Sequence, residues 1–356
     1  MGCAGNQYGS FEFSPTNIGR AAGPGRLLSM EIEFSLRCNF RCPYCYVADD
    51  AVLENELGPG EIRDVIQQAK SLGAGKIIVL GGEPTIYPGI VDMVRFMGGL
   101  GLEVEIFTNG SGVTPELARF FYEEKVRVVL KMNTFDEALQ DRLAGCAGAF
   151  QTIRRALESL RQAGYPDDDA FLAASTIICR QNFDELPDLW QWLCDRGIEP
   201  YFEIMTPQSR AVDNRWLEVD PATLHRLFAR LAEIDRTRYG RVWEAQPPLV
   251  GNRCLRHQFS CLVTSRGEVM PCVGITLSQG NIRERPLEEI LAGSRVIRDL
   301  KNHRNTIKGP CRTCEKAEQC YGCRGAAFQV TGDYLASDPL CWNNCDASLQ
   351  VLCREG

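Results

Sequence analysis

Short strand-like runs alternate with helical stretches from about residue 30 to residue 235. The run Met30–Ser35, for example, alternates between apolar and polar residues as a strand does. The predicted strands are Glu31–Ser35, Lys76–Leu80, Glu103–Thr108, Val126–Met132, Leu172–Ile178 and Pro200–Ile204. The predicted helices are Gly60–Ser71, Ile90–Met97, Pro115–Glu123, Phe150–Gln162, Leu186–Arg196 and Pro221–Arg236. This alternation predicts parallel strands joined by helical crossovers, either as a partial (β/α)6 barrel or as a doubly wound sheet.

The alternation stops near Gln246–Leu249, where two prolines follow each other. Consecutive prolines break both helix and strand, so this stretch is predicted to be a linker. Ten of the seventeen cysteines lie beyond it, between Cys254 and Cys353. We therefore expect a flexible, Gly-rich lead-in over residues 1–29, a barrel domain over 30–240 and a small cysteine-rich domain over 250–356. Metal clusters, more than an apolar core, would hold this last domain together.

The composition narrows the function classes. With 356 residues, of which 44% are hydrophobic, the chain can bury a barrel core and carry a second small module. Its net charge of −7 offers no basic surface of the kind that nucleic-acid binding needs, and no run approaches the length of a membrane span. No secretory signal is evident, so seventeen cysteines indicate metal ligation in a reducing cytoplasm and not disulfides. Three histidines are too few for a histidine-rich metal site.

Three closely spaced cysteines follow the first predicted strand: Cys38, Cys42 and Cys45. Thiolates at this spacing can hold an iron–sulfur cube, but a [4Fe–4S] cluster normally takes four cysteine ligands. One iron would stay open and could bind a small molecule, as the vacant position of a catalytic metal does. Part of a zinc site or of a disulfide framework is the alternative interpretation. Because the loop begins where a strand ends, as chemistry-bearing loops of barrel enzymes do, a reactive site is favoured.

Two further motifs follow the next two predicted strands. Gly81-Gly82-Glu83-Pro84 comes after the second strand, and Thr108-Asn109-Gly110 comes after the third. In a parallel barrel all three loops would meet at one mouth. The glycines let the backbone approach a ligand, so exposed carbonyls and the Glu83 carboxylate could receive an ammonium group. Taken alone, each motif is an ordinary turn.

The cysteine spacing, the aromatic Tyr44 before Cys45 and the Gly81–Pro84 run resemble the signature of radical S-adenosylmethionine (SAM) enzymes. The resemblance implies a partial (β/α)6 barrel and a [4Fe–4S] cluster on Cys38, Cys42 and Cys45. Its open iron chelates the amino and carboxylate groups of SAM, and an electron from the cluster cleaves SAM to a 5′-deoxyadenosyl radical. The resemblance implies SAM contacts from Tyr44, Gly81, Gly82, Glu83, Pro84, Thr108 and Asn109.

One strand end departs from this pattern. The fourth strand ends in Lys131-Met132-Asn133, where many relatives have a Ser and an Asp. No ribose contact is therefore carried over to this position. Lys131 and Asn133 are either substrate contacts or structural residues, with Lys131 then paired to a carboxylate.

The cysteines near the C-terminus carry a second resemblance. Cys254, Cys261 and Cys272 precede the run Cys311-x2-Cys314-x5-Cys320-x2-Cys323, and Cys341 and Cys345 follow it. Together with Gly267-x4-Cys272, this order resembles the SPASM domain of radical SAM enzymes, which holds two auxiliary clusters. The resemblance assigns one auxiliary [4Fe–4S] cluster to Cys254, Cys261, Cys272 and Cys323, and the other to Cys311, Cys314, Cys320 and Cys341.

Three points about these cysteines stay open. The family usually has three residues where two separate Cys320 from Cys323, so the division of the ligands and the role of Cys345 are undecided. Zinc is the rival metal, although zinc ribbons usually separate their cysteine pairs by many more residues. The remaining cysteines, Cys3, Cys146, Cys179, Cys194 and Cys353, are interpreted as free thiols or small core residues.

The resemblance implies an enzyme that abstracts a substrate hydrogen atom, with auxiliary clusters as an exit for an electron or as a coordination point for substrate. We expect oxidative modification of a peptide or protein side chain. A small molecule such as a sugar or aminocyclitol is the alternative substrate, and a non-catalytic iron–sulfur electron carrier is the hypothesis from another class. Relatives that oxidise sulfatases have an Asp after the cysteine matching Cys272; Val273 stands here, which disfavours that activity.

The expected partners follow from the same resemblance. An electron donor such as flavodoxin or ferredoxin is needed, and 29 residues before the first strand are too short for a leader-binding domain, so a separate leader-peptide-binding protein is expected for a peptide substrate. No nucleic-acid or membrane partner is expected. Lys131, Glu203, Arg210 and Arg256 lie near strand ends or the domain junction and are predicted to be either substrate contacts or ion-paired surface groups.

Overall fold

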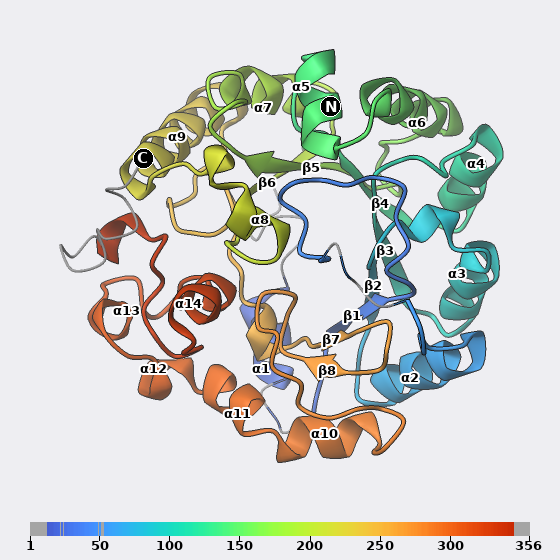
Figure 1. The fold of residues 1–356 in the computed structure, drawn as a ribbon, viewed down its shortest axis with the longest axis vertical. Helices are drawn as coiled ribbons and strands as arrows, with labels where there is room; N and C mark the ends of the chain where they lie inside the picture. The colour runs from blue at the N-terminus through green and yellow to red at the C-terminus, as the bar shows by residue number, and fades with distance from the viewer. Residues whose placement is uncertain (1–12, 22, 24, 49, 51–52, 345–356) are drawn as a thin grey trace.

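Eight strands form one sheet, in the order β6-β5-β4-β3-β2-β1-β7-β8. This computed structural model describes residues 13–344 except 22, 24, 49, 51 and 52. The strands are β1 (Ser29–Glu33), β2 (Lys76–Leu80), β3 (Glu103–Thr108), β4 (Arg127–Lys131), β5 (Leu172–Ile178), β6 (Glu199–Ile204), β7 (Leu262–Val263) and β8 (Val269–Met270). All neighbouring pairs are parallel except β7 and β8. The curved sheet is surrounded by helices, which confirms the partial barrel predicted from the sequence (Figure 1).

Helices cover the outer face of the strands. They are α2 (Pro59–Ser71), α3 (Ile90–Gly99), α4 (Pro115–Glu123), α5 (Glu137–Ala144), α6 (Ala149–Ala163), α7 (Leu186–Cys194) and α9 (Pro221–Ile234). The short helix α8 (Arg210–Asp213) lies inside the ring of helices (Figure 1). The six predicted helices are all present, with ends shifted by one or two residues where they differ. The short helices α5 and α8 were not predicted.

Alternation within the strands creates an inner and an outer surface. Along β1, Met30 and Ile32 join the apolar core beneath the helices, whereas Ser29 and Glu31 line a cavity inside the barrel. All five residues of β1 are buried. A strand with buried polar residues on its inner face must satisfy them within the barrel, so the inner surface is where chemistry can be expected.

Strand β1 ends two residues before the predicted end. The carbonyl of Ser35 accepts a hydrogen bond from Gly82 at 2.8 Å, and the amide of Leu36 donates to the Glu56 carboxylate at 2.7 Å. These bonds hold the backbone in the loop that carries the three cysteines. In the sequence, apolar and polar residues continue to alternate as far as Ser35, but the backbone pairs with β2 only as far as Glu33.

The cysteine-rich region continues the barrel sheet. Strand β7 pairs in parallel with β1, through Glu31 opposite Leu262 and Ile32 opposite Val263. Its helices are α10 (Leu287–Gly293), α11 (Arg295–Lys301), α12 (His303–Thr306), α13 (Pro310–Thr313) and α14 (Arg324–Thr331), which follow β8 around the sheet (Figure 1). The predicted domain boundaries remain a prediction, because the two regions share one sheet.

The predicted linker is ordered. The amide of Ile204 donates to the carbonyl of Pro248 at 2.9 Å, and the amide of Val250 donates to the carbonyl of Phe202 at 3.0 Å. A proline lacks a backbone donor but keeps its carbonyl acceptor, so it can lie along a strand edge. The stretch Gln246–Leu249 therefore runs along β6 in an ordered conformation, although two prolines follow each other there.

Part of the predicted lead-in is also ordered. Helix α1 (Pro15–Arg20) is capped by the hydroxyl of Ser14, which accepts from Asn17 at 3.2 Å. The ring of Phe13 packs edge-on against Phe259 with centroids 4.9 Å apart. The described residues between 13 and 29 therefore contain ordered structure, whereas residues 1–12, 22 and 24 lie outside the described part. Within the described residues, no helix is both long and apolar enough to cross a membrane.

The core position of Ile32 allows a test of this fold. Ile32 is fully buried between β1 and the covering helices, so Ile32→Ala should lower the free energy of unfolding by about 2–5 kcal/mol. The exposed Val242 is the control, and Val242→Ala should change it by less than about 0.5 kcal/mol. Urea unfolding of the iron-loaded proteins, followed by circular dichroism, measures both. Equal effects of the two substitutions would contradict the placement of Ile32 in the core.

Candidate active site

The barrel encloses a cavity of about 310 Å³. The three motif loops line it, as their positions after successive strands predicted, and residues from the cysteine-rich region complete its wall. Among the predicted site residues, those lining it are Cys38, Cys42, Tyr44, Cys45, Gly81, Gly82, Glu83, Thr108, Asn109, Lys131, Glu203, Cys254 and Arg256. Pro84 begins the 3-10 turn η1 (Pro84–Ile86) behind the cavity, and Arg210 lies in α8 outside the lining.

The loop of the three cysteines is held in place by a helix that sequence reasoning missed. The amide of Arg41 donates to the carbonyl of Ala144, the last residue of α5, at 2.9 Å. The next residue, Gly145, has a φ of +59°, and a Cβ atom there would lie 2.1 Å from the carbonyl oxygen of Arg41. Glycine at this helix end is therefore required by the close approach of the cysteine loop.

The three cysteines are partly buried, and their surroundings disfavour charge on an isolated thiolate. Burial raises the pKa of Cys42 to about 12, the neighbouring Cys45 adds to the shift, and Lys131 opposes it. Burial also raises the pKa of Cys45, while the cations Arg210 and Lys131 lower it. Metal ligation would supply the missing compensation, because a coordinating thiol is deprotonated by the metal.

The glycine pair lies directly against the cysteine loop. The amide of Glu83 donates to the carbonyl of Arg37 at 2.8 Å, and a Cβ atom on Gly82 would lie 2.0 Å from that carbonyl oxygen. Gly81 has a φ of +117°, which other residues rarely adopt. Sequence reasoning assigned the glycines to ligand approach; the structure shows that they also bring two loops of the site together.

The Glu83 carboxylate is hydrogen-bonded to other residues of the protein. It accepts hydrogen bonds from the hydroxyls of Thr85 and Thr108, each at 2.5 Å, and from the amides of Thr85 and Asn109 at 2.9 and 2.6 Å. Glu83 is 3% exposed, and burial raises its pKa although these bonds oppose the shift. Because its lone pairs are engaged, an ammonium group would meet the backbone carbonyls of this loop more readily than the carboxylate.

Tyr44 connects the cysteine loop with the fourth strand. Its hydroxyl accepts a hydrogen bond from the side-chain amide of Asn133 at 2.9 Å, and the Nζ atom of Lys131 lies 5.1 Å from the centre of its ring. Asn133 is fully buried and also accepts from the amide of Ile177 at 3.0 Å. Of the two interpretations, Asn133 is therefore structural.

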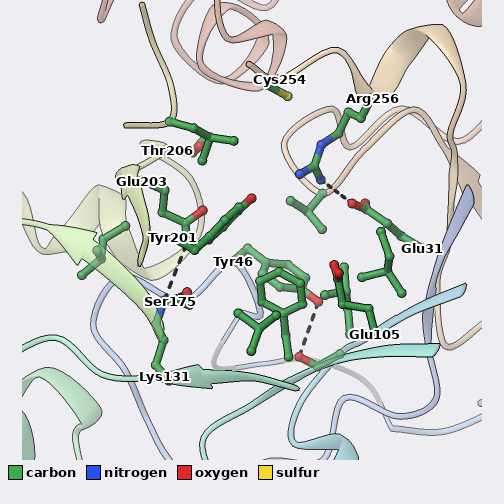
Figure 2. Close-up of a pocket in the computed structure, with 18 of the residues that line it drawn as sticks. Glu31, Tyr46, Glu105, Lys131, Ser175, Tyr201, Glu203, Thr206, Cys254 and Arg256 are labelled. Carbon is green, nitrogen blue, oxygen red and sulfur yellow. Dashed lines mark hydrogen bonds and ion pairs between the residues drawn. The ribbon is translucent and has the colours of Figure 1, made fainter. Parts of the chain in front are cut away.

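Charged pairs stand on the remaining walls of the cavity. Lys131 donates to the hydroxyl of Ser175 at 3.0 Å and lies 3.6 Å from the Glu203 carboxylate. On the other side, Arg256 pairs with Glu31, and Figure 2 shows these two side chains pointing toward each other. Although burial disfavours the cation, Glu31 and Cys254 hold the pKa of Arg256 above its usual value.

Sequence reasoning missed some of the cavity residues. Glu31, Tyr46 and Tyr201 line the cavity and were not predicted (Figure 2). The available signal was a polar residue at every second position of a strand, as in Ser29-x-Glu31 and Tyr201-x-Glu203, because such residues share the inner face.

A second, small cavity brings together the four cysteines assigned to the second auxiliary cluster: Cys311, Cys314, Cys320 and Cys341. Amide donors surround their sulfur atoms. The amides of Gly322 and Asp338 donate to Cys320 and Cys311 at 3.2 and 3.4 Å, and the side-chain amide of Asn344 donates to Cys311 at 3.1 Å. This donor set fits an iron–sulfur cluster, whose ligand sulfurs accept such bonds. Cys345 lies outside the described residues.

Three cysteines of the predicted first auxiliary cluster also lie near one another. Burial raises the pKa of Cys323, and Asp338, Cys254 and Cys272 add to the shift. Cys254 and Cys272 act in the same way on the pKa of Tyr321, again after burial. Cys261 does not take part in these interactions and packs in the barrel core. The structure therefore brings three of the four predicted ligands together.

A buried arginine lies next to these cysteines. Arg324 follows Cys323 directly and is 1% exposed. Its Nη1 atom donates to the carbonyls of Tyr334 and Ala336, whereas Nε and Nη2 have no hydrogen-bond partner within the described residues. A buried cation is costly unless an anion lies nearby. The buried Asp338 carboxylate interacts electrostatically with Arg324 but accepts no hydrogen bond from these two donors. An iron–sulfur cluster with thiolate ligands would be a further anion beside them, so the site fits the group.

Within the described residues, no three His, Cys, Asp or Glu side chains converge on a point where one metal ion would sit. The cysteines of a four-iron cluster bind different irons, so they surround a volume and need not converge. The described cysteines all have free thiols.

Fold and site define an α/β-barrel enzyme with a three-cysteine loop at the barrel mouth and a cysteine-rich C-terminal region. Residues 32–193 match the family model described as "Radical SAM superfamily", and residues 254–315 match "Iron-sulfur cluster-binding domain", the SPASM domain. The chain is a radical SAM enzyme and belongs to this superfamily, with a SPASM domain. It therefore binds SAM and iron–sulfur clusters, and the electron-carrier hypothesis loses its support.

Two curated relatives and one solved structure span most of the chain. The chain is 31% identical to a "PqqA peptide cyclase" from Streptomyces rochei over 340 residues, which cover 89% of this chain and 90% of the relative. It is 28% identical to an "AdoMet-dependent heme synthase" from Methanosarcina barkeri over 337 residues, covering 87% and 94%. The structure of SuiB from Streptococcus suis bound to precursor peptide SuiA has a TM-score of 0.70 at 16% identity, covering 92% of this chain and 78% of SuiB. This last similarity concerns the fold alone.

The hydrogen bonds of Glu83 lead to a prediction about SAM binding. In Glu83→Gln, one acceptor oxygen becomes an amide donor and must face the hydroxyl and amide donors that now bond to Glu83. We expect SAM to bind about tenfold more weakly or worse, since a mismatched buried group costs about 1–3 kcal/mol. Equilibrium dialysis of SAM with iron-loaded protein measures this. The control is Glu158→Gln on the exposed face of α6, which should bind SAM as the parent does. Unchanged SAM affinity in Glu83→Gln would contradict the proposal that Glu83 holds the SAM-binding loops in position.

Removal of iron should loosen the C-terminal region more than the barrel. The apolar cluster beside the small cavity has only three buried members, Ile307, Cys311 and Tyr321, so it contributes little stability by itself. Without a cluster, Arg324 would also keep buried donors that lack a hydrogen-bond partner. After chelation, amide hydrogen exchange over residues 310–341 should therefore rise, while β1 to β5 stay protected. Mass spectrometry of protein before and after chelation measures this. Equal protection of residues 310–341 in both samples would show that metal does not hold this region.

Proposed function

We propose that this enzyme cleaves SAM reductively at a cluster held by Cys38, Cys42 and Cys45 and abstracts a hydrogen atom from a peptide or protein side chain that is then oxidised. One observation carries the proposal: a single cavity has the three-cysteine loop on one wall and Cys254, beside charged groups, on another. In such a cavity SAM and a substrate group would lie near each other. The proposal for the site residues follows from this arrangement.

The residues that would hold the cofactors are those at the three strand ends. Cys38, Cys42 and Cys45 would bind three irons of a [4Fe–4S] cluster, and backbone carbonyls of Gly81–Glu83 would accept hydrogen bonds from the amino group of SAM. When bound, the cluster and SAM supply a 5′-deoxyadenosyl radical. Tyr44, Thr108 and Asn109 would border SAM because they line the same wall. Pro84 would act indirectly, because it begins the 3-10 turn that follows Glu83 and so fixes the position of that residue.

Cations beside the cysteine loop have a defined electrostatic task. Lys131 and Arg210 both lower the pKa of Cys45 after the larger opposing effect of burial, so both act near that thiol. Their charges would favour the anionic cluster and the carboxylate of SAM in a cavity with little water. Arg210, which lies outside the cavity lining, is thereby proposed to act on the cluster through its charge and not as a substrate contact.

An oxidative outcome requires a proton acceptor and an exit for an electron. Glu203 lines the cavity with a side chain that is 33% exposed, and its pairing with Lys131 orients the carboxylate. We propose Glu203 as the base that takes the proton from the substrate. Cys254 lines the same cavity, so an auxiliary cluster there would accept the electron directly from the substrate. Two auxiliary clusters are proposed in all.

The size of the cavity supports a side chain as the group that enters. Its volume of about 310 Å³ is at the lower end of ligand sites and must also accommodate SAM. A peptide can insert one side chain and leave the rest of its length outside. The similarity to a peptide cyclase over 90% of that relative supports the same substrate class. A leader-peptide-binding protein and an electron donor such as flavodoxin or ferredoxin remain proposed partners.

A small molecule that carries carboxylates is the second candidate substrate. Two cations, Lys131 and Arg256, lie on the cavity walls and could bind carboxylates by exchanging their present partners. The similarity to heme synthases over 94% of one relative supports this candidate. Either substrate would be modified where thiols stay reduced, in keeping with the predicted cytoplasmic location and with the free thiols of the described cysteines.

Formation of 5′-deoxyadenosine tests the proposal. The anaerobically reconstituted, dithionite-reduced protein should convert SAM to 5′-deoxyadenosine, because the open iron delivers the electron to bound SAM. The Cys38/Cys42/Cys45→Ala variant should form none. Chromatography of the reaction mixture measures the product.

The matched control replaces three other cysteines. Cys146, Cys179 and Cys194 line neither cavity, so the Cys146/Cys179/Cys194→Ala variant should retain the product. A parent protein that contains its iron and forms no 5′-deoxyadenosine would reject the proposal. Loss of product in both variants would show that the three-cysteine loop has no special role.

A further inference from the structure

Cys261 faces away from the cavity. It precedes β7, and its carbonyl accepts a hydrogen bond from the amide of Glu31 at 2.8 Å, so it continues the pairing with β1. In this register Val263 lies opposite Ile32, whose side chain belongs to the outer core. Side chains alternate along a strand, so Cys261 and Val263 face the same outer side. A thiol on that side cannot complete a cluster that borders the cavity at Cys254.

The surroundings of Cys261 agree with this direction. Cys272 packs with Ile275 and Leu300 in a separate apolar group, whereas Cys261 is part of the main core. Burial raises the pKa of Cys261 to about 12, and the charges that act on it are those of Glu31 and Lys301. The Lys301 ammonium is in turn held by backbone carbonyls of the segment after α1, such as that of Ala21 at 3.0 Å. The neighbourhood of Cys261 is therefore structural.

His257 lies beside the cysteines that do gather. It follows Cys254 with two residues between them, the spacing that also separates Cys311 from Cys314. Burial lowers the pKa of its ring, Arg256 and Arg324 add to this shift, and the backbone of Pro271, the residue before Cys272, opposes it. Its amide donates to the hydroxyl of Tyr321 at 3.4 Å, and the centroids of the two rings lie 5.4 Å apart. That phenol interacts electrostatically with Cys254 and Cys272. The imidazole therefore lies near the segments that carry these two cysteines.

The bonding of the ring is that of a metal ligand. His257 is 4% exposed, and its Nδ1 atom has no hydrogen-bond partner within the described residues. An unpaired buried nitrogen of this kind costs free energy unless something binds it. Histidines that ligate metals usually donate their other ring N–H to a carboxylate or a backbone carbonyl, which fixes the tautomer. The backbone carbonyl of Pro271 would take this role.

We propose that the first auxiliary cluster is ligated by Cys254, Cys272, Cys323 and the Nδ1 atom of His257, and that Cys261 is not a ligand. Imidazole replaces thiolate in some natural iron–sulfur clusters and raises their reduction potential. A cluster with this ligand set would accept an electron from the substrate more readily than one with four thiolates. The inference rests on the proposed auxiliary clusters, and its test separates the two.

The test uses the Cys38/Cys42/Cys45→Ala variant, in which any remaining iron belongs to the auxiliary sites. The protein is labelled with ¹⁵N-histidine, reduced, and examined by pulsed electron paramagnetic resonance for coupling between a histidine nitrogen and the cluster. The chain has three histidines, so few alternatives need to be separated. We expect a coupling in this background that His257→Gln abolishes and that the control His303→Gln leaves in place.

Iron content tests the cysteines. In the same background, Cys272→Ala should lose about four irons per chain, the content of one cluster, whereas Cys261→Ala should lose none. If His257→Gln fails to retain the cluster, His257→Cys should restore the iron without the nitrogen coupling and with a lower midpoint potential. Equal loss of iron in Cys261→Ala and Cys272→Ala, or no nitrogen coupling in iron-containing protein, would overturn the proposal. Protein of this background that binds no iron would instead reject the auxiliary clusters themselves.

Discussion

The contact between the cysteine loop and the Gly81–Glu83 loop is the constraint on which the site depends. Two backbone hydrogen bonds join them, from Gly82 to Ser35 and from Glu83 to Arg37, each at 2.8 Å. A side chain on Gly82 would overlap the carbonyl of Arg37, so this approach exists only with glycine there. The Glu83 carboxylate then extends the connection to the end of β3 through Thr108 and Asn109. The three loops therefore form one rigid unit, and the positions of the three thiols are set before any cofactor binds.

Several charged side chains among the described residues are buried beside a counter-charge. In the pairs Lys76–Glu105, Arg256–Glu31 and Arg241–Asp235 at least one partner is buried, and the attraction between the partners offsets part of the lost hydration. Arg324 is 1% exposed and keeps two donors without a hydrogen-bond partner within the described residues. The buried Asp338 carboxylate interacts electrostatically with Arg324 but accepts no hydrogen bond from these two donors. A cluster with thiolate ligands beside Cys323 would be a second anion near this cation.

The sequence predicted the barrel and the converging loops because long apolar periodicity and turn motifs are local signals. Strands β2, β3 and β5 have the predicted ends, since their ladders run the full length of the apolar runs. Helix α5 was missed because its eight residues show weak amphipathicity, yet its end holds the cysteine loop. The ordered path of Gln246–Leu249 along β6 was missed because pairing of proline carbonyls depends on the tertiary structure. The direction of Cys261 likewise depends on a strand register that spacing alone does not contain.

The C-terminal region is part of the barrel wall, and this limits how the enzyme can work. Strand β7 extends the sheet beside β1, and the Arg256–Glu31 pair crosses the cavity side of the same junction. The loop that carries Cys254 therefore cannot move away from the cavity without breaking the ladder and leaving Glu31 buried without its cation. Loss of either partner in such a pair costs several kcal/mol, roughly 3–5. Substrate entry by separation of the two regions is thus disfavoured, and the loops at the carboxyl ends of the strands are left as the route by which SAM and a substrate side chain reach the same cavity.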